Sequence, residues 1–260
     1  MEVVIHSSVE HLARLAGDAV EALLRRRPDA VLGLATGSSP VAVYDDLVRR
    51  HEEGLSFARV RGFLLDEYVG LPADHPEGYR NVIERELVSR VDLDPAAVQA
   101  PDGGADDLPA ACASYEAAIQ AAGGVDLQIL GIGTDGHVAF NEPGSSLASR
   151  TRVKTLTAQT LRDNARFFAD DVDAVPRHVL TQGLGTIMEA RHLVLLAQGR
   201  AKAEAVHQLV EGPISALWPG TILQMHPHVT VLLDEAAASR LQLADYYRQT
   251  YAHKPAWQGL

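Results

Sequence analysis

Residues 30–53 read AVLGLATGSSPVAVYDDLVRRHEE, and they indicate which fold class the chain belongs to. Ala30 to Ala35 form a nearly continuous apolar run, which is typical of a strand that is buried on both faces of its sheet. A loop that ends at Pro40 follows, and the residues after it return to helical periodicity, with Pro40 placed in the first turn. The stretch therefore predicts a strand, a tight loop and a helix, which is the repeating unit of a parallel α/β sheet.

The same alternation continues on both sides of this stretch. Ser7 and Glu10 have the spacing of a capping box and predict the start of the first helix. The alternation predicts an α/β fold with a doubly wound, mostly parallel sheet, helices on both faces and one domain over residues 1–260. The expected strands are 2–6, 30–35, 60–65, 127–131, 152–156, 192–197 and 229–233, and the expected helices after the second strand lie within 79–90, 108–122 and 201–211.

Composition excludes several classes of function. Lys and Arg number 23 against 34 Asp and Glu, a formal net charge of −11, which disfavours broad binding to nucleic acid or to an anionic membrane. The single cysteine, Cys112, has no partner for a disulfide or a zinc knuckle, so we expect a reducing, cytoplasmic location. We find no basic leader and no apolar stretch of the ~18 residues that cross a bilayer.

Two strand ends carry polar residues where open α/β sheets bind ligands. After the strand at 30–35, Thr36, Gly37, Ser38 and Ser39 precede a helix whose free N–H groups and dipole suit a phosphate or carboxylate. The alternative is an ordinary turn with a serine cap. After the strand at 60–65, Asp66 precedes Glu67, and a partly desolvated carboxylate there would gain basicity. The alternative is a pair of solvated loop acids.

The loop LGIGTDGHVAFNEP at residues 130–143 is the richest strand end. Its glycines allow tight turns, and Asp135 and Glu142 place two carboxylates beside the imidazole of His137, as in an oriented catalytic base. We therefore favour catalysis over a structural histidine. Further along, Arg166 and Lys202 are candidate anion donors. His226 and His228 flank a proline, and no third ligand lies nearby, so we interpret that pair as structural and predict no metal site.

Together these segments resemble the glucosamine-6-phosphate deaminases, the glucosamine/galactosamine-6-phosphate isomerase family. The resemblance runs from about Val31 to Asp234, and the motifs occur in the family's order. It implies a modified doubly wound α/β fold and a ketose-forming hydrolase that converts glucosamine 6-phosphate and water to fructose 6-phosphate and ammonia, without a metal or other cofactor, in amino sugar catabolism. The segments are LGLATGSSP, LLDEYVGL, GIGTDGHVAFNEPGSSLASRTRVKTLT, LTQGLGTI and AQGRAKAEAVHQLVEGPISALWPGTILQMHP.

The resemblance also assigns roles to residues. Asp66 corresponds to the base that moves the C2 proton to C1. His137 corresponds to the acid/base group that opens the sugar ring, with Asp135 and Glu142 as its partners. The residues that correspond to the phosphate grip are Thr36, Gly37, Ser38, Ser39, Arg166 and Lys202. Residues 156–181 contain Arg166 and show little sheet signal, so they are expected to form a lid over the sugar.

Some family members are activated by N-acetylglucosamine 6-phosphate at a subunit contact. Ser145, Arg152, Lys154 and Thr155 match that site, whereas Arg248 stands where those members have a tyrosine. In the phosphate loop, Ser38 and Ser39 stand where many relatives carry Gly-Thr. The family contains hexamers and monomers, and a closed homo-oligomer is the general expectation.

Three other functions stay open. A 6-phosphogluconolactonase shares the G-x-G-x-D-G-H core, but neither the continuation AFNEP nor LDEYVGL is expected of it. A deaminase for galactosamine 6-phosphate differs only at C4, which the sequence does not discriminate. A sugar-phosphate sensor, like the effector domain of bacterial repressors, would carry a basic helix-turn-helix ahead of this fold and would be free to lose Asp66.

Overall fold

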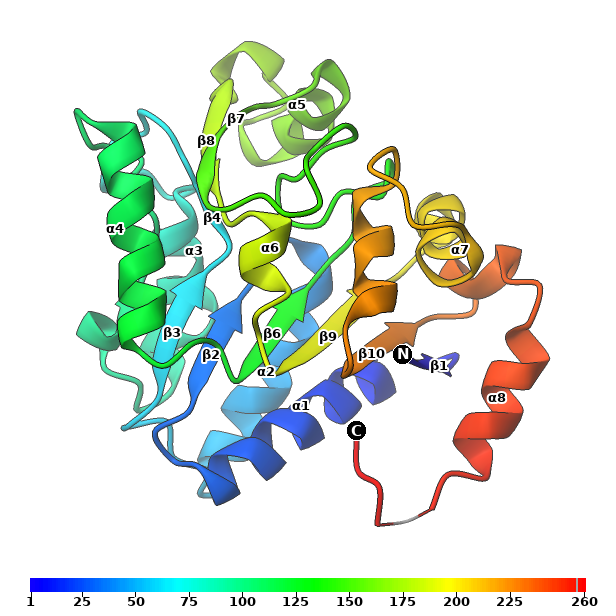
Figure 1. The fold of residues 1–260 in the computed structure, drawn as a ribbon. Coiled ribbons are helices and arrows are strands. Elements are labelled where there is room, and N and C mark those ends of the chain that lie inside the picture. The colour runs from blue at the N-terminus through cyan, green and yellow to red at the C-terminus, as the bar shows by residue number, and fades with distance from the viewer. Residues whose placement is uncertain (256) are drawn as a thin grey trace.

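A seven-stranded parallel sheet forms the centre of the molecule in the computed structural model, which describes residues 1–255 and 257–260 (Figure 1). Every neighbouring pair of strands in this sheet is parallel, which confirms the predicted doubly wound sheet. In spatial order the strands are β1 (Glu2–Ile5), β10 (Val229–Leu233), β9 (His192–Ala197), β6 (Leu127–Leu130), β2 (Val31–Leu34), β3 (Arg61–Leu64) and β5 (Val98–Gln99).

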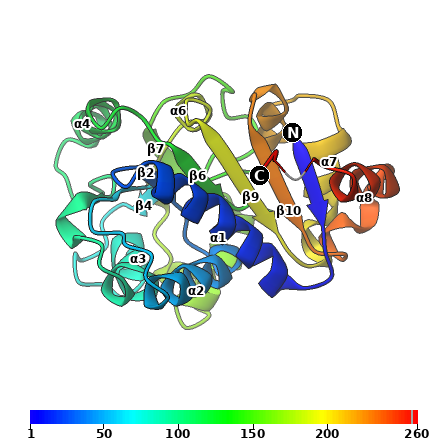
Figure 2. The ribbon, with the colours of Figure 1, turned by 90° about the horizontal axis from the view of Figure 1, so that it is seen from below.

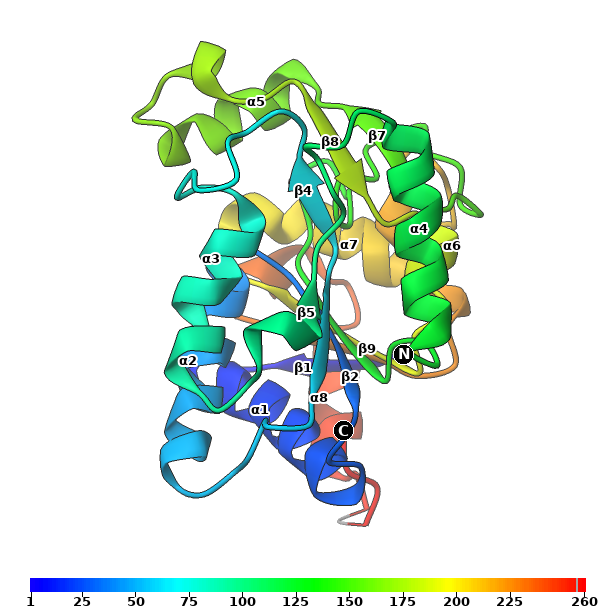
Figure 3. The same cartoon turned by 90° about the vertical axis from the view of Figure 1, so that its left-hand side faces the viewer.

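Helices cover both faces of this sheet, as the alternation of strands and helices predicted. Figure 3 shows α2 and α3 on one side and α4 and α6 on the other, and α1 packs against α2. Figure 2 shows α7 and α8 towards the β1 edge. Because both faces are covered, β2, β6, β9 and β10 are buried along their whole length. The helices are α1 (Val9–Arg26), α2 (Ser38–Glu52), α3 (Tyr79–Glu86), α4 (Leu108–Ala121), α5 (Ala158–Asn164), α6 (Leu184–Ile187), α7 (Ala203–Glu211) and α8 (Ala244–Ala252), and short 3₁₀ turns lie at 88–90, 95–97, 165–167, 172–174, 200–202, 219–225 and 237–240.

A second, antiparallel sheet lies beyond the carboxyl ends of the large sheet (Figures 1 and 3). It consists of β4 (Asp66–Tyr68), β8 (His178–Thr181) and β7 (Arg152–Thr155), in that order. The sequence predicted the strand at 152–156 as part of one alternating sheet, and it belongs to this second sheet instead. The segment 156–181 contains α5 and two 3₁₀ turns, and it ends in β8, which is hydrogen-bonded on both sides.

Each sheet has its own apolar packing. The main core joins α1, α2, α3 and α4 to the large sheet. A smaller cluster packs the segment 156–181 against the second sheet, and its members are Tyr68, Phe140, Leu156, Ala165, Phe168, Val175 and Val179. The segment therefore has apolar support of its own, separate from the core of the large sheet.

The predicted start of α1 is wrong by one residue. Ser8, rather than Ser7, is the N-cap, and its hydroxyl accepts a hydrogen bond from the backbone N–H of His11. The third helical position is therefore His11, so the reciprocal contact of a capping box with Glu10 does not form. Of the helices that the structure describes, none has the length and apolar character that a bilayer span requires.

Candidate active site

Four neighbouring strands carry the predicted site residues to one edge of the large sheet. The order β9, β6, β2, β3 places the loops after these strands side by side, because parallel strands all end at the same edge. A cavity of about 770 Å³ opens there beneath α5. The predicted residues that line it are Thr36, Gly37, Ser38, Ser39, Asp66, His137, Arg166 and Lys202.

The loop after β2 presents backbone donors to this cavity. Gly37 is the N-cap of α2 with φ of 107°, a conformation that favours glycine, and it provides no side-chain cap. Ser38 and Ser39 are therefore the first residues of a 15-residue helix, with their N–H groups free of intrahelical partners. The helix dipole adds positive potential at this end, so the loop has the features of an anion cradle. Pro40 lies in the first turn, as predicted.

Both of the predicted cations line the same cavity. Lys202 lies in the turn before α7 and Arg166 in the turn after α5, and neither makes an ion pair within residues 1–255 and 257–260. Burial lowers the pKa of Lys202, and Arg166 lowers it further while Asp163 acts in the opposite direction. A cation that loses its hydration without gaining a counter-ion is stabilised by a bound anion.

Asp66 reaches the cavity from the first residue of β4. It is 6% exposed, and no described residue donates a hydrogen bond to its carboxylate. Burial raises its pKa well above the ordinary value for aspartate, and the charge of Glu67 adds to that effect. Its carboxylate is therefore more basic than that of a solvated aspartate, as a general base requires.

Glu67 lies on the opposite face of β4 and does not line the cavity. Its carboxylate accepts hydrogen bonds of 2.9 Å from the backbone N–H groups of Tyr68, Tyr79 and Arg80, the last two at the start of α3. The acid pair is therefore divided between two roles: Asp66 faces the cavity, and Glu67 caps a helix.

His137 is paired with Asp135 in the loop after β6. Nδ1 of the imidazole lies 2.7 Å from Oδ1 of Asp135, and the same oxygen accepts a hydrogen bond from the backbone N–H of His137. Burial acts to raise the pKa of Asp135, but its interactions with His137 outweigh burial and lower that pKa. Gly133 leaves room for the ring, because a Cβ at that position would lie 2.3 Å from Cε1 of His137.

Glu142 does not have the partner that the sequence predicted. Within the part of the chain that the structure describes, it makes no hydrogen bond or ion pair with His137. It is 3% exposed and accepts hydrogen bonds from the backbone and hydroxyl of Thr157 and from the hydroxyl of Thr160, at 2.5 to 3.2 Å. Thr157 is the N-cap of α5, so Glu142 holds the start of the helix above the cavity.

The residues matched to an effector site are only partly together. Arg152 and Lys154 share one face of β7, where burial lowers the pKa of each. Ser145 is buried, and its hydroxyl has no partner in the described residues. Thr155 faces the other side, with its hydroxyl 3.2 Å from Nδ1 of His178. Arg248 lies in α8, which packs on β1, and is paired there with Glu235 and Asp245.

Sequence reasoning missed several polar residues that line the cavity, and four of them are Tyr68, Tyr79, Asn164 and Gln198. The hydroxyl of Tyr79 and the amide nitrogen of Asn164 each donate a hydrogen bond to the hydroxyl oxygen of Tyr68. The side-chain amide nitrogen of Gln198 is buried and has no hydrogen-bond partner in the described chain. The alternation along β4 could have placed Tyr68 beside Asp66, since residues two apart share a face. Nothing local in the sequence indicates the other three.

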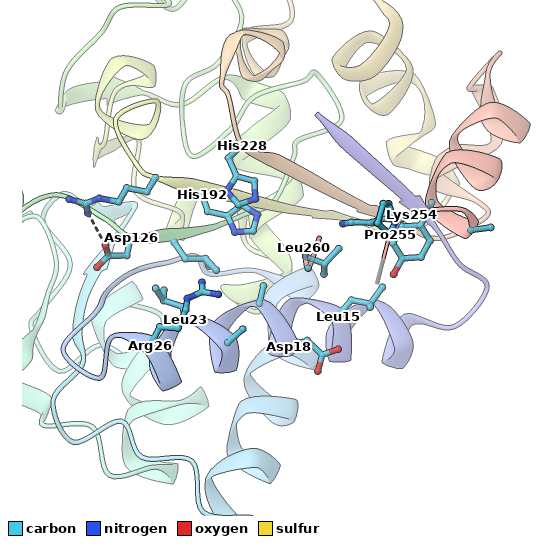
Figure 4. A pocket seen from close by; sticks show the side chains of 17 residues that line it. Leu15, Asp18, Leu23, Arg26, Asp126, His192, His228, Lys254, Pro255 and Leu260 are labelled. Atoms are coloured by element: carbon cyan, nitrogen blue, oxygen red, sulfur yellow. Dashed lines mark hydrogen bonds and ion pairs between the residues drawn. The ribbon is translucent and has the colours of Figure 1, made fainter. Parts of the chain in front are cut away.

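A second cavity of about 770 Å³ lies between α1, the starts of β6 and β9 and the C-terminal residues (Figure 4). Its walls include the stacked rings of His192 and His228, with centroids 3.6 Å apart, and Asp126 is paired with Arg191. Burial lowers the pKa of His192 to about 3, so that ring is neutral at neutral pH. Nε2 of His226 lies 2.7 Å from the carbonyl oxygen of Ala190, and Nδ1 accepts a hydrogen bond from the backbone N–H of His228, in keeping with the structural role predicted for it.

The chemistry therefore concentrates in the first cavity. A buried basic carboxylate, an imidazole oriented by a second carboxylate, an anion cradle and two unpaired cations surround one space. This combination suits a phosphorylated substrate that undergoes two separate proton transfers. Within residues 1–255 and 257–260, no group of three His, Cys, Asp or Glu side chains is arranged to hold a metal ion.

The chain is similar to known proteins along almost its whole length. Residues 5–232 match the family model of glucosamine-6-phosphate isomerases and 6-phosphogluconolactonases. The chain is 73% identical to a glucosamine-6-phosphate deaminase of Mycolicibacterium smegmatis and 58% identical to one of Streptomyces coelicolor, in both cases over 100% of each protein. A solved monomeric glucosamine-6-phosphate deaminase matches 92% of this chain and 99% of its own, with a TM-score of 0.90 and 43% identity. The 6-phosphogluconolactonase of Trypanosoma cruzi shares the fold, with a TM-score of 0.75, 22% identity and coverage of 93% and 97%.

Proposed function

Because the chain belongs to the family of glucosamine-6-phosphate isomerases and 6-phosphogluconolactonases, we propose that it is a glucosamine-6-phosphate deaminase. It would convert glucosamine 6-phosphate and water to fructose 6-phosphate and ammonia. The observation that carries the proposal is the 73% identity to a deaminase along the full length of both chains. The matching lactonase, at 22% identity, supports the fold alone.

The phosphate is bound first in this proposal. The N-terminus of α2, with Thr36, Gly37, Ser38 and Ser39, accepts it, and Lys202 and Arg166 supply the charge. Arg166 belongs to the segment 156–181, so the grip forms fully only when that segment covers the sugar as a lid. Binding energy from the phosphate then holds C1 and C2 near Asp66 and His137.

Two proton transfers follow. His137, oriented by Asp135, moves a proton between O1 and the ring oxygen, which opens the pyranose. Asp66 takes the proton from C2 and returns it to C1, while the ammonium group gives up one proton and O1 of the aldehyde gains one, so that C1 becomes a CH2OH carbon and C2 becomes an iminium carbon. Water adds to C2 and ammonia leaves, which gives the ketose. An internal proton transfer precedes the attack of water, so the reaction is an isomerising deamination rather than a simple hydrolysis.

Glu142 acts indirectly in this proposal. Its carboxylate accepts hydrogen bonds from Thr157 and Thr160 at the start of α5 and so sets the position of the lid, and it does not contact His137 in this structure. We keep the group Ser145, Arg152, Lys154 and Thr155 as a proposed regulatory anion site, which N-acetylglucosamine 6-phosphate would test as an activator. The proposed location is the cytoplasm, on the strength of the single cysteine.

The decisive experiment is to measure ammonia and fructose 6-phosphate from glucosamine 6-phosphate, beside galactosamine 6-phosphate and 6-phosphogluconolactone, without added metal. Matched formation of both products from the first substrate supports the proposal. Hydrolysis of the lactone alone would make the chain a lactonase, and tight sugar-phosphate binding without turnover would make it a sensor.

A further inference from the structure

Tyr68 shares the cavity face of β4 with Asp66. Residues two apart on a strand point to the same side, and both of these residues line the cavity while Glu67 does not. The ring of Tyr68 is 2% exposed and packs against the rings of Tyr79, Phe140 and Phe168, with centroids 4.7 to 6.3 Å apart. Tyr68 is thus held rigidly beside the proposed base.

The hydrogen bonds of the phenol are incomplete. Its oxygen accepts one from the hydroxyl of Tyr79, at 3.1 Å, and one from the amide nitrogen of Asn164, at 3.0 Å. A phenol also carries one proton to donate. No acceptor for that proton is found in residues 1–255 and 257–260. Burial raises the pKa of Tyr68 to about 12, so the proton stays in place at neutral pH.

We propose that Tyr68 donates this proton to a hydroxyl oxygen of the bound sugar and so determines which sugars are accepted. This inference rests on the proposed function. An unsatisfied buried donor is destabilising, and a ligand that supplies the acceptor is favoured over one that lacks it. Tyr68 is then a binding residue beside the base and takes no part in the proton transfers.

The acceptor is identified by elimination. The ammonium group of the substrate has no lone pair, so it accepts no hydrogen bond. The phosphate is assigned to the cradle at α2 and the two cations. O1 and the ring oxygen are assigned to His137. The hydroxyls on C3 and C4 remain, and Tyr68 contacts one of them.

The lid also takes part in this contact. Figure 3 shows α5 above β4. Asn164 is the last residue of α5, and Phe168 follows it in the turn beyond, so this segment contacts both the oxygen and the ring of Tyr68. With both acceptor positions filled from Tyr79 and Asn164, the remaining proton has a fixed direction. The donor is therefore oriented only when the lid is in the position described here.

The test compares wild-type protein with Tyr68→Phe, which keeps the ring and its packing and removes the proton. The ligand is the alditol obtained by reducing C1 of glucosamine 6-phosphate, which binds without reacting, together with its 3-deoxy and 4-deoxy forms. We expect wild-type protein to prefer the parent over one deoxy form by about 5- to 150-fold in Kd, the scale of one buried donor left unpaired. In Tyr68→Phe this preference should fall to about 2-fold or less.

The matched control is Tyr115→Phe, which removes a buried phenol that is bonded to the carbonyl of Leu64 and does not line the cavity. The control should keep the wild-type preference. An unchanged preference in Tyr68→Phe for both deoxy forms, with wild-type thermal stability, would overturn the inference. The binding comparison uses ligands that do not react, so it can be interpreted without any turnover. A wild-type protein that releases no ammonia from glucosamine 6-phosphate would refute the proposed function, and the binding comparison would still test the role of Tyr68.

Discussion

A methyl group added at Gly133 tests whether His137 must lie where the structure places it. The Cβ of Gly133→Ala would lie 2.3 to 2.5 Å from three atoms of the imidazole, whereas ordinary contact begins near 3.4 Å. The ring must therefore move by about 1 Å. Gly133 is not among the residues with positive φ, so alanine adopts its backbone conformation without strain and the clash is the main perturbation.

The expected loss of activity follows from that displacement. A shift of about 1 Å in a catalytic group costs on the order of 10²-fold in rate, which is about 2.7 kcal/mol of transition-state stabilisation. The shift also lengthens the 2.7 Å contact between His137 and Asp135 that orients the ring. KM should change little, because the phosphate cradle is on a different loop.

The stability of Gly133→Ala should fall only slightly. The His137 side chain is 21% exposed, so the ring has space to swing into the cavity, and we expect the low end of the 1–3 kcal/mol cost of overpacking. The assay is steady-state release of ammonia from glucosamine 6-phosphate, with thermal unfolding in parallel. Gly104→Ala is the control, since a Cβ there meets nothing closer than 3.5 Å. Wild-type kcat in Gly133→Ala would refute the reasoning.

The other predictions concern the base, the phosphate grip and the lid. Asp66→Asn should lower kcat by ~10² or more at similar KM. Because burial and then Glu67 raise the pKa of Asp66 in the folded state, Asp66 makes the native state less stable once the pH rises above the ordinary pKa of aspartate, and the effect is complete above the raised pKa. The variant should therefore unfold at a higher temperature than the wild type near pH 7, and the difference should be lost in acid. Glu67→Gln should move the acid limb of the pH dependence of kcat/KM to lower pH, because it removes the charge that helps to raise the pKa of Asp66. An acid limb at the wild-type pH would contradict this. Lys202→Gln should raise KM for glucosamine 6-phosphate by ~10-fold or more while kcat changes less, and an unaltered KM would remove this cation from the grip. Thr157→Ala should destabilise α5 by about 1 kcal/mol, because the helix loses its N-cap. We expect faster proteolysis within 156–177 while the temperature of global unfolding stays nearly unchanged. Equal cleavage rates in variant and wild type would argue against a helix that opens separately.

The sequence by itself predicted six strands of the large sheet and the edge of that sheet at which the polar loops gather, but it missed β5. The apolar runs at 30–35, 127–131, 192–197 and 229–233 are strands in the structure, because a strand covered on both faces must be apolar throughout. The loops that follow these runs could then be assigned to one edge, since parallel strands end together. Asp66, His137 and the loop at 36–39 do meet there.

Only the tertiary structure decided which partners these residues have. β4 pairs with β8 across more than a hundred residues of chain, and three-residue strands carry too little periodicity to be recognised locally. Asp135 and Glu142 looked equivalent beside His137, yet the fold brings Thr157 and Thr160 to Glu142 and leaves the imidazole to Asp135. The contact from Asn164 to Tyr68 likewise depends on where the lid lies. The local pattern of apolar and polar residues predicts whether a residue is buried. Which side chain it contacts depends on how segments that are distant in the sequence pair in the fold.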